Sequence, residues 1–268
     1  MALEPGLLAA LRSVASTPQL LVALDFDGTL APLVERAEDA RALPASAEAV
    51  RVLAALPGTT TALISGRALD SLRAVADPPA DTLLIGSHGA ETWTGPDGAP
   101  LALTSEQADL LARAVDVVER IAAGHEGTRV EFKPAGVVLH TRTAADDVAE
   151  SAVVAAREEL ASLDGLSITD GKRVLEISVV EADKGQGLAL LRRTTGATGV
   201  LFAGDDVTDE HAQRTLGPDD LGIRIGQGDT AASFTVATPE DFAEVLQELV
   251  SLRRAGAPNQ GSCHTTGA

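Results

Sequence analysis

The order of apolar and polar positions predicts alternating strands and helices in the first hundred residues. Short aliphatic runs at 21–26, 60–64 and 83–85 have the length and composition of buried strands. Helical periodicity marks about 45–56 and 68–75. Strands that alternate with helices are typical of a parallel sheet with helical crossover connections, so we expect an α/β unit here.

The pattern changes near residue 101. Long helices are predicted from Ser105 to Ala122 and at about 144–163, and each precedes two strands joined by a hairpin-length link. This repeat of one helix and two strands predicts a small α+β unit on an antiparallel sheet. The two strand pairs are 129–132 with 136–141, and 166–169 with 173–179.

The strand-helix alternation then resumes with a helix from near Lys184, a strand at 199–203 and a helix from near Asp209. Short strands at 223–225 and 233–236 and a helix at 239–252 complete the pattern. We therefore predict an α/β core at 1–100 and 181–254, interrupted by an inserted α+β domain at 101–180. The small, polar segment 255–268 is predicted to be disordered.

The amino-acid composition and net charge limit the kinds of molecule that the protein is expected to bind. The chain of 268 residues is 45% hydrophobic and 22% charged, which is typical of a globular protein. Its net charge of −18 disfavours nucleic acid and anionic membranes, since both attract lysine and arginine. The single cysteine, Cys263, excludes a disulfide within one chain. We see no signal peptide and no apolar run of transmembrane length, so we expect a cytoplasmic protein.

The first strand ends on two aspartates, Asp25 and Asp27, followed by Gly28. Burying carboxylates is costly unless a cation compensates their charge. In open α/β sheets, ligands bind at the carboxyl ends of the strands. An isolated pattern of this kind is also compatible with a helix cap or an Asx-turn.

A second acidic strand end favours the metal interpretation. The strand at 199–203 is followed by Asp205, Asp206 and Asp209. Because Mg²⁺ takes hard oxygen ligands, two strands that end in carboxylates predict one Mg²⁺ site. Asp209 and Glu210 could instead simply open a helix, where acidic residues interact favourably with the helix dipole.

Further residues indicate phosphoryl transfer. A carboxylate can act as a nucleophile, and Ser65 follows another predicted strand. Lys184 is one of only three lysines among 21 basic residues, which indicates a position that needs a compact charge. A metal, a nucleophile, a lysine and a hydroxyl together predict a phosphoryl-transfer site, and a Walker A loop is absent.

These motifs resemble those of the haloacid-dehalogenase-like superfamily of phosphatases. Asp25–Leu30, Ser65, Lys184 and Gly204-Asp205-Asp206-x-x-Asp209 occur in the order of its four motifs. Within it, the chain resembles the trehalose-6-phosphate phosphatases over about residues 20–250, and it departs from their pattern at Thr141 and Ser178-Val179. The matching motifs also include Ser65-Gly66-Arg67, Gly86–Glu91, Asp183-Lys184-Gly185, Gly204–Glu210, Glu131-Phe132-Lys133, His140-Thr141-Arg142 and Gly171-Lys172 with Leu175-Glu176.

The resemblance implies a Rossmannoid core with an inserted α+β cap, and it implies roles for the motif residues. Asp25 would attack phosphorus and form an aspartyl-phosphate. Asp27 would protonate the leaving sugar oxygen and then activate water. Ser65 and Lys184 would hold phosphoryl oxygens. Mg²⁺ would be bound by the Asp25 carboxylate, the Asp27 backbone carbonyl and Asp205. Asp206 and Asp209 would lie in or near the layer of residues that surrounds these ligands.

The resemblance also implies the substrate, trehalose 6-phosphate, and functional coupling to a trehalose-6-phosphate synthase. Candidates for substrate binding are Gly66, Arg67, His88, Glu131, Lys133, His140, Arg142, Lys172 and Glu176. His140 and Arg142 could instead serve packing or a surface ion pair, and Arg67 could support the site from its edge. Alternative functions are a phosphatase of another sugar or glycoside phosphate, of the sucrose-phosphate or glycosyl-glycerate type, or a non-catalytic sugar-phosphate sensor. The intact catalytic set argues against the sensor.

Overall fold

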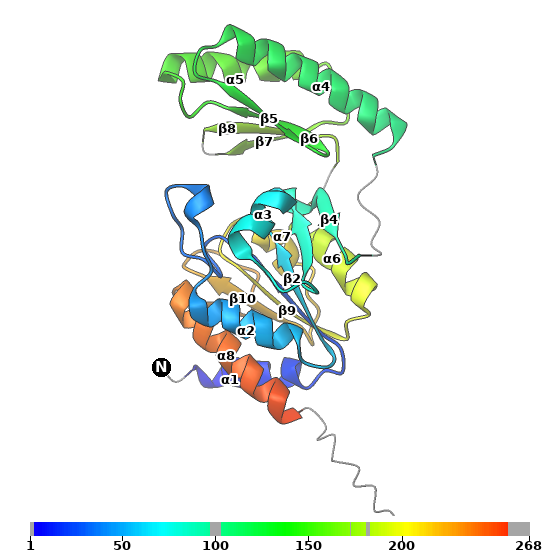
Figure 1. Cartoon of the computed structure of the whole chain (residues 1–268), viewed down its shortest axis with the longest axis vertical. Helices are drawn as coiled ribbons and strands as arrows, with labels where there is room; N and C mark the ends of the chain where they lie inside the picture. The colour runs from blue at the N-terminus through cyan, green and yellow to red at the C-terminus, as the bar shows by residue number, and fades with distance from the viewer. Residues whose placement is uncertain (1–2, 97–102, 172, 181–182, 257–268) are drawn as a thin grey trace, which may run out of the picture.

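The computed structural model describes residues 3–96, 103–171, 173–180 and 183–256. The predictions for Lys172, for the side chain of His88 and for the segment from 257 onward, Cys263 included, lie outside the described residues. No helix of the described part is long and apolar enough to cross a membrane. Two sheets organise the chain, one above the other in Figure 1.

The larger sheet has seven strands in the order β11-β10-β9-β1-β2-β3-β4, parallel except for β4. At its centre, Leu24 of β1 pairs with Leu63 of β2 and with Ala203 of β9. The three strands therefore end level with one another, and the residues that follow them meet at one edge. The strands are β1 (Leu20–Leu24), β2 (Thr59–Ile64), β3 (Leu83–Gly86), β4 (Glu91–Trp93), β9 (Gly199–Gly204), β10 (Leu221–Ile225) and β11 (Phe234–Val236).

Helices cover both faces of this sheet because its strands are apolar on both faces. Leu20, Val22 and Leu24 of β1 pack against one group of helices, while Leu21 and Ala23 pack against the other. The first group is α1 (Pro5–Ala15), α2 (Pro44–Ala54), α3 (Leu69–Ala76) and α8 (Pro239–Gly256), and the second is α6 (Lys184–Thr195) and α7 (Asp209–Gln213). Two 3₁₀ turns, η1 (Ala37–Asp39) and η2 (Ser87–Gly89), lie in the connections.

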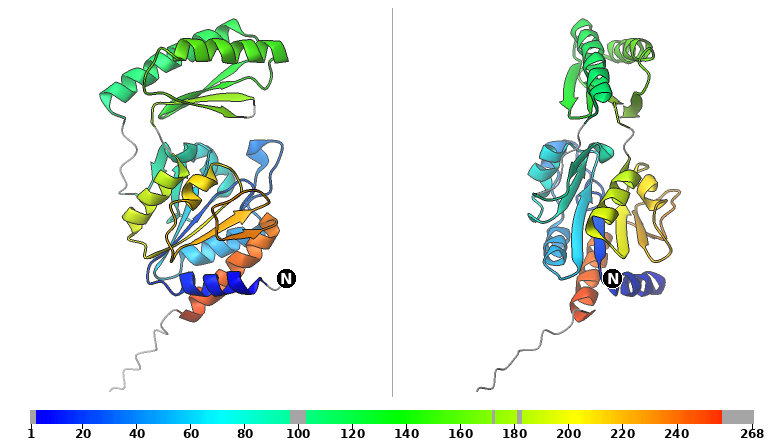
Figure 2. Two further views of the ribbon diagram at one scale, coloured as in Figure 1. Left: turned by 180° about the vertical axis from the view of Figure 1, so that it is seen from behind. Right: turned by 90° about the vertical axis from the view of Figure 1, so that its right-hand side faces the viewer.

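The smaller sheet has four antiparallel strands in the order β5-β6-β8-β7. Alternate residues, such as Val137, Leu139 and Leu175, pack on two helices that cover one face. The other face is turned toward the strand ends of the larger sheet, as Figures 1 and 2 show. The elements are α4 (Ser105–Gly124), β5 (Arg129–Lys133), β6 (Gly136–His140), α5 (Asp146–Leu160), β7 (Ser167–Gly171) and β8 (Val174–Ser178).

Strand register decides which side chains face the larger sheet. Glu131 pairs with Val138, and Val138 pairs with Glu176, so these three share a face. The neighbouring positions Val130, Val137 and Ile177 belong to the apolar cluster under the helices. Because side chains alternate along a strand, Glu131, Lys133, His140 and Glu176 all lie on the face away from the helices.

A helix and a strand were not predicted, and α4 and α8 end later than predicted. Helix α1, whose Leu7, Leu11 and Val14 are buried, and the antiparallel edge strand β4 were both missed. Helix α8 continues to Gly256, so the first two residues of the segment predicted to be disordered are helical. Arg253 holds this last turn, since its guanidinium donates to the carbonyl oxygens of Ala15, Thr17 and Gly58 among other acceptors.

Candidate active site

Three strand ends supply the centre of the site. Asp25 follows β1, Ser65 follows β2 and Asp205 follows β9. The backbone N–H of Asp25 donates to the carbonyl of Ala203 (2.9 Å), and that of Ser65 donates to the carbonyl of Ile85 (2.9 Å). Sheet hydrogen bonds thus fix the backbone at Asp25 and Ser65, which positions their side chains.

Lys184, the first residue of α6, lies at the middle of the acidic group. Its Nζ is 2.7 Å from Oδ1 of Asp25 and 2.7 Å from Oδ1 of Asp209, and its side chain is 3% exposed. Burial favours the neutral amine, but the two carboxylates outweigh burial and hold the pKa of Lys184 above its ordinary value. The ammonium therefore stays charged and binds the two carboxylates together.

The carboxylates themselves are crowded and partly withdrawn from water. Burial raises the pKa of Asp25 to about 8, with Lys184 opposing the shift and Asp209 and Asp205 adding to it. Burial, together with Asp209, raises the pKa of Asp205 to about 6. These shifts indicate more negative charge than one lysine compensates, which a further cation would stabilise.

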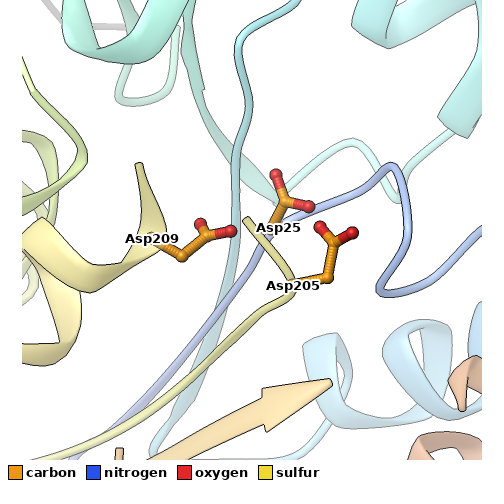
Figure 3. Close-up of side chains that lie close together, drawn as sticks. All are labelled: Asp25, Asp205 and Asp209. Atoms are coloured by element: carbon orange, nitrogen blue, oxygen red, sulfur yellow. The ribbon is translucent and has the colours of Figure 1, made fainter. Parts of the chain in front are cut away.

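Three aspartates form a group that could hold such a cation. The side chains of Asp25, Asp205 and Asp209 lie close together, as Figure 3 shows. Each offers a carboxylate oxygen, and these oxygens lie within 4.8 Å of one another. Carboxylate oxygens are the donors that Mg²⁺ prefers, so the residues present fit that ion. Both oxygens of Asp209 already accept hydrogen bonds, from Lys184 and from the N–H of Asp206 (2.9 Å), whereas Asp25 uses Oδ1 alone toward Lys184.

Two glycines allow the carboxylates to come this close. A Cβ at Gly28 would lie 2.0 Å from Oδ2 of Asp205, and one at Gly204 would lie 2.2 Å from Cγ of Asp209. Any other residue at either position would displace an aspartate of the group. The glycine of the first motif therefore has a steric role in placing Asp205.

The side chains of the other two predicted metal ligands have different partners. The Asp27 carboxylate is bound by Arg67 through two hydrogen bonds of 2.6 Å. Asp206 is exposed, and its carboxylate accepts hydrogen bonds from the N–H of Val207 (2.7 Å) and the hydroxyl of Thr208 (3.3 Å). Asp206 thus stabilises the turn before α7.

Ser65 is placed to donate a hydrogen bond. It is 1% exposed, and its Oγ accepts a hydrogen bond from the N–H of Arg67 (3.1 Å). Because the oxygen is already engaged as an acceptor, its own hydrogen is free to point toward an anion in the cleft.

A cleft of about 780 Å³ lies above these residues, between the two sheets. Sequence reasoning missed part of its wall, namely Leu33, Val34 and Glu35 in the connection after β1. Leu33 is 73% exposed, and two aliphatic residues in a loop carry no signal that separates them from an ordinary surface segment. The cleft is lined by Asp25, Asp27, Leu33, Val34, Glu35, Ala37, Ser65, Gly66, Arg67, Ala68, Ser71, Glu131, Lys133, Arg142, Lys184, Asp205, Asp206 and Thr208.

The predicted sugar-reading residues of the smaller domain do not all line the cleft. Glu131, Lys133 and Arg142 line the cleft itself. His140 is not part of the cleft lining, and its Nε2 lies 2.7 Å from Oε2 of Glu131. Glu176 is 3.7 Å from Lys133 and lines an adjoining cavity of about 540 Å³, which also reaches Lys184.

Glu91 is a buried polar residue next to the site that was not predicted as a site residue, and its partner Ser87 lines the adjoining cavity. The carboxylate of Glu91 accepts hydrogen bonds from the hydroxyl of Ser87 and the N–H of Leu69 (3.4 Å) at the start of α3. Ser87 has a φ of +47°, which is uncommon for a residue other than glycine. The motif Gly86–Glu91 was the available signal, but a sequence does not show that its glutamate is buried.

The fold places the chain among proteins of known structure. Its mostly parallel sheet, at whose carboxyl edge Asp25, Asp27 and Lys184 lie, has the fold of solved haloacid dehalogenase-like hydrolases. A haloacid dehalogenase-like hydrolase from B. subtilis matches with a TM-score of 0.57 at 16% identity, over 85% of this chain and 98% of that chain. The C-terminal domain of C. albicans trehalose-6-phosphate phosphatase matches with a TM-score of 0.72 at 20% identity, over 93% and 97%. The predicted fold class is confirmed.

The particular family follows from sequence comparison. The trehalose-phosphatase family model matches residues 23–240, and the chain belongs to this family. It is 33% identical over 255 residues to the trehalose-phosphate phosphatase of Mycobacterium marinum and 35% identical over 257 residues to that of Mycobacterium tuberculosis. Each alignment covers 88% of this chain and 63% of the relative. An uncharacterized glycosyl hydrolase of M. tuberculosis is 35% identical over 248 residues, which are 85% of this chain and 18% of that protein.

Proposed function

We propose that this chain hydrolyses trehalose 6-phosphate to trehalose and phosphate. The observation that carries the proposal is the buried Asp25–Lys184–Asp209 group beside Asp205, placed under a cleft whose opposite wall holds Glu131, Lys133 and Arg142. Reactive charges lie on one side and hydrogen-bonding groups that suit sugar hydroxyls lie on the other. Membership of the trehalose-phosphatase family supports the same substrate.

In the first proposed step, Asp25 attacks phosphorus. Lys184 binds Oδ1 of Asp25, which leaves Oδ2 for the new bond. The bond between phosphorus and the sugar oxygen breaks, and Asp27 supplies the proton that the leaving oxygen needs. Ser65 and Lys184 stabilise the charge on the transferred group, since donors fixed by the fold need no reorganisation during the reaction.

In the second proposed step, water attacks the aspartyl-phosphate. Asp27 takes the proton from water, and release of phosphate restores the Asp25 carboxylate. Asp25 and Asp205 would hold Mg²⁺ with Asp209 beside them, and the ion would neutralise charge on the phosphoryl group and on the carboxylates.

Substrate selection is proposed to come from the smaller sheet. A neutral disaccharide offers only hydroxyl and ether oxygens, and a polar site that hydrogen-bonds them rejects analogues that lack them. Glu131 and Glu176 would accept from hydroxyls, and Lys133 and Arg142 would donate to sugar oxygens. We also propose cytoplasmic location and functional coupling to a trehalose-6-phosphate synthase, because another enzyme must supply the phosphorylated disaccharide.

A panel of phosphate esters tests this proposal. Phosphate release is measured with Mg²⁺ on trehalose 6-phosphate, sucrose 6-phosphate, glucosylglycerate phosphate, glucose 6-phosphate and p-nitrophenyl phosphate. We expect kcat/KM for trehalose 6-phosphate to exceed that for each other sugar ester by about 10-fold or more. A higher value for another sugar phosphate would replace the proposed substrate, and no release from any ester would contradict a phosphatase.

A further inference from the structure

Arg67 and Asp27 form a two-pronged ion pair at the wall of the cleft. Nε of Arg67 donates to Oδ2 of Asp27 and Nη2 donates to Oδ1, each at 2.6 Å. Parallel hydrogen bonds of this kind fix the orientation of a carboxylate as well as its charge. Among the described residues, no other side chain hydrogen-bonds the Asp27 carboxylate, so its orientation depends on Arg67.

Arg67 is itself held from several directions. Its guanidinium carbon lies 5.7 Å from the centre of the Phe26 ring, and its side chain is 10% exposed. Its backbone N–H donates to Oγ of Ser65, and its carbonyl accepts from the N–H of Ser87 (2.7 Å). The arginine is therefore a rigid support, whereas the Asp27 side chain is 33% exposed toward the cleft.

Most of the donors of Arg67 are directed at the protein itself. Of its five N–H groups, Nε and one on Nη2 donate to Asp27, and one on Nη1 lies 3.5 Å from Oγ of Ser71. The motif that contains Arg67 suggested a substrate contact. The geometry instead directs its strongest hydrogen bonds to the residue that exchanges protons in the proposed reaction.

We propose that Arg67 is a positioning residue for Asp27. It holds the carboxylate where Asp27 can give a proton to the leaving oxygen and take one from the attacking water. One of the two hydrogen bonds yields when its oxygen carries the proton, and the other keeps the group in place. This inference rests on the proposed function for the role of Asp27, but not on the identity of the sugar.

A double-mutant cycle tests whether Arg67 acts through Asp27. The variants are Arg67→Ala, Asp27→Asn and the double variant, measured on trehalose 6-phosphate and on p-nitrophenyl phosphate. The second ester has a leaving group that needs no proton, so on it Asp27→Asn should slow only the hydrolysis of the aspartyl-phosphate and should leave more turnover than on trehalose 6-phosphate. Residues that act as one unit give non-additive losses.

We expect Arg67→Ala to lower kcat on both esters by about 10-fold or more, with KM changed less than about 3-fold. In the Asp27→Asn background, the same substitution should cost less than about 2-fold. Guanidinium ion added to Arg67→Ala should restore part of the activity when Asp27 is present and none when it is Asn. A full additional loss in the Asp27→Asn background, or a rise in KM for trehalose 6-phosphate alone, would overturn the inference.

Two further variants serve as a control and as a replacement if Arg67→Ala does not fold. Arg73 is a matched control, because it also lies near a carboxylate, Asp70 (3.6 Å), and an aromatic ring, Trp93 (5.5 Å), but does not line the cleft. Arg73→Ala should leave kcat unchanged. If Arg67→Ala does not fold, Arg67→Lys replaces it in the cycle with the same expectations. Wild-type protein that releases phosphate from neither ester would contradict the proposed function, a result separate from the outcome of the cycle.

Discussion

At the scale of single residues, Lys184 shows why the chain uses a lysine where arginine is its usual cation. Its ammonium is nearly inaccessible and lies 2.7 Å from two carboxylate oxygens on different elements. A compact group with three donors fits between them, whereas a guanidinium is larger, planar and holds its donors in fixed directions. The scarcity of lysine elsewhere in the chain and the motif Asp183-Lys184-Gly185 were the signs of this requirement in the sequence.

Lys184→Arg should therefore lower kcat for trehalose 6-phosphate by about 10²-fold or more, although it conserves charge. The larger side chain should push Asp25 or Asp209 out of place, because Lys184 already lies 2.7 Å from an oxygen of each and is almost fully buried. Steady-state phosphate release, with circular dichroism to verify folding, measures the effect. Activity near that of the wild type would show that charge alone is needed at this position.

The sequence indicated which residues lie together at the sheet edge, but it did not indicate which side chains contact one another there. Asp25, Lys184, Asp205 and Asp209 follow strands or begin helices, so simple rules of parallel sheets bring them together. The pairing of Arg67 with Asp27 and the burial of Glu91 depend on the path of loops after β2 and β3. No local pattern encodes those paths, so these contacts could not be predicted.

At the scale of elements, a buried ion pair ties α7 to β10 below the aspartates. Arg224 of β10 donates to Oε1 of Glu210 at 2.9 Å, and Oε2 accepts from the N–H of Ala231 (2.7 Å). Burial works to raise the pKa of Glu210, but hydrogen bonds from Ala231, Thr230 and Arg224 outweigh it and keep the pKa below its usual value. Glu210 therefore adds stability above the pKa of an unfolded glutamate, and that stability falls as the pH drops through the folded pKa.

Arg224→Met should lower the free energy of unfolding by about 3–5 kcal/mol at pH 7, because Glu210 is left buried without its cation. The loss should shrink at lower pH, where Glu210 accepts a proton and the unpaired charge disappears. Urea unfolding at pH 7 and pH 5 measures both values. In a Glu210→Gln background the same substitution should cost much less, and a loss independent of pH would contradict the account.

The predicted strands agree with the structure where burial of aliphatic side chains alone determines the strand. Aliphatic runs of five or six residues are buried on both faces, and their polar ends mark the site. The strand β4 spans only Glu91–Trp93 and pairs antiparallel at an edge, so it lacks that signal. The end of α8 was predicted too early because Arg253 holds its last turn in place. The guanidinium donates to the carbonyl of Ala15 at the end of α1 and to that of Gly58 just before β2, and both residues are far away in the chain.

At the scale of the whole molecule, the two sheets divide the proposed work. The acidic group and Ser65 belong to the larger sheet, and the polar face with Glu131 and Lys133 belongs to the smaller one. A small apolar cluster, including Ala90, Ala135 and Val179, lies where the two parts meet. The molecule carries a net charge of −18, so binding of a phosphate ester depends on the few cations that line the cleft.

Lys133→Ala should reduce kcat/KM for trehalose 6-phosphate by about 10²-fold, since a hydrogen bond to a charged group is lost and Glu176 is left without its partner. Hydrolysis of p-nitrophenyl phosphate, which does not extend to the smaller sheet, should change little. Arg120→Ala is the matched control, because Arg120 pairs with Glu159 (2.5 Å) on the helices of the same part. Equal losses on both esters would indicate a role in folding or chemistry.

The central proposal is that Asp25 is the nucleophile in the hydrolysis of trehalose 6-phosphate. Asp25→Asn keeps the size of the side chain but removes the charge that attacks phosphorus. Removing one carboxylate from a crowded buried group should leave the protein folded, as circular dichroism can show. The account predicts phosphate release from trehalose 6-phosphate at the background rate with Mg²⁺ present. Substantial Mg²⁺-dependent release by folded Asp25→Asn would contradict it.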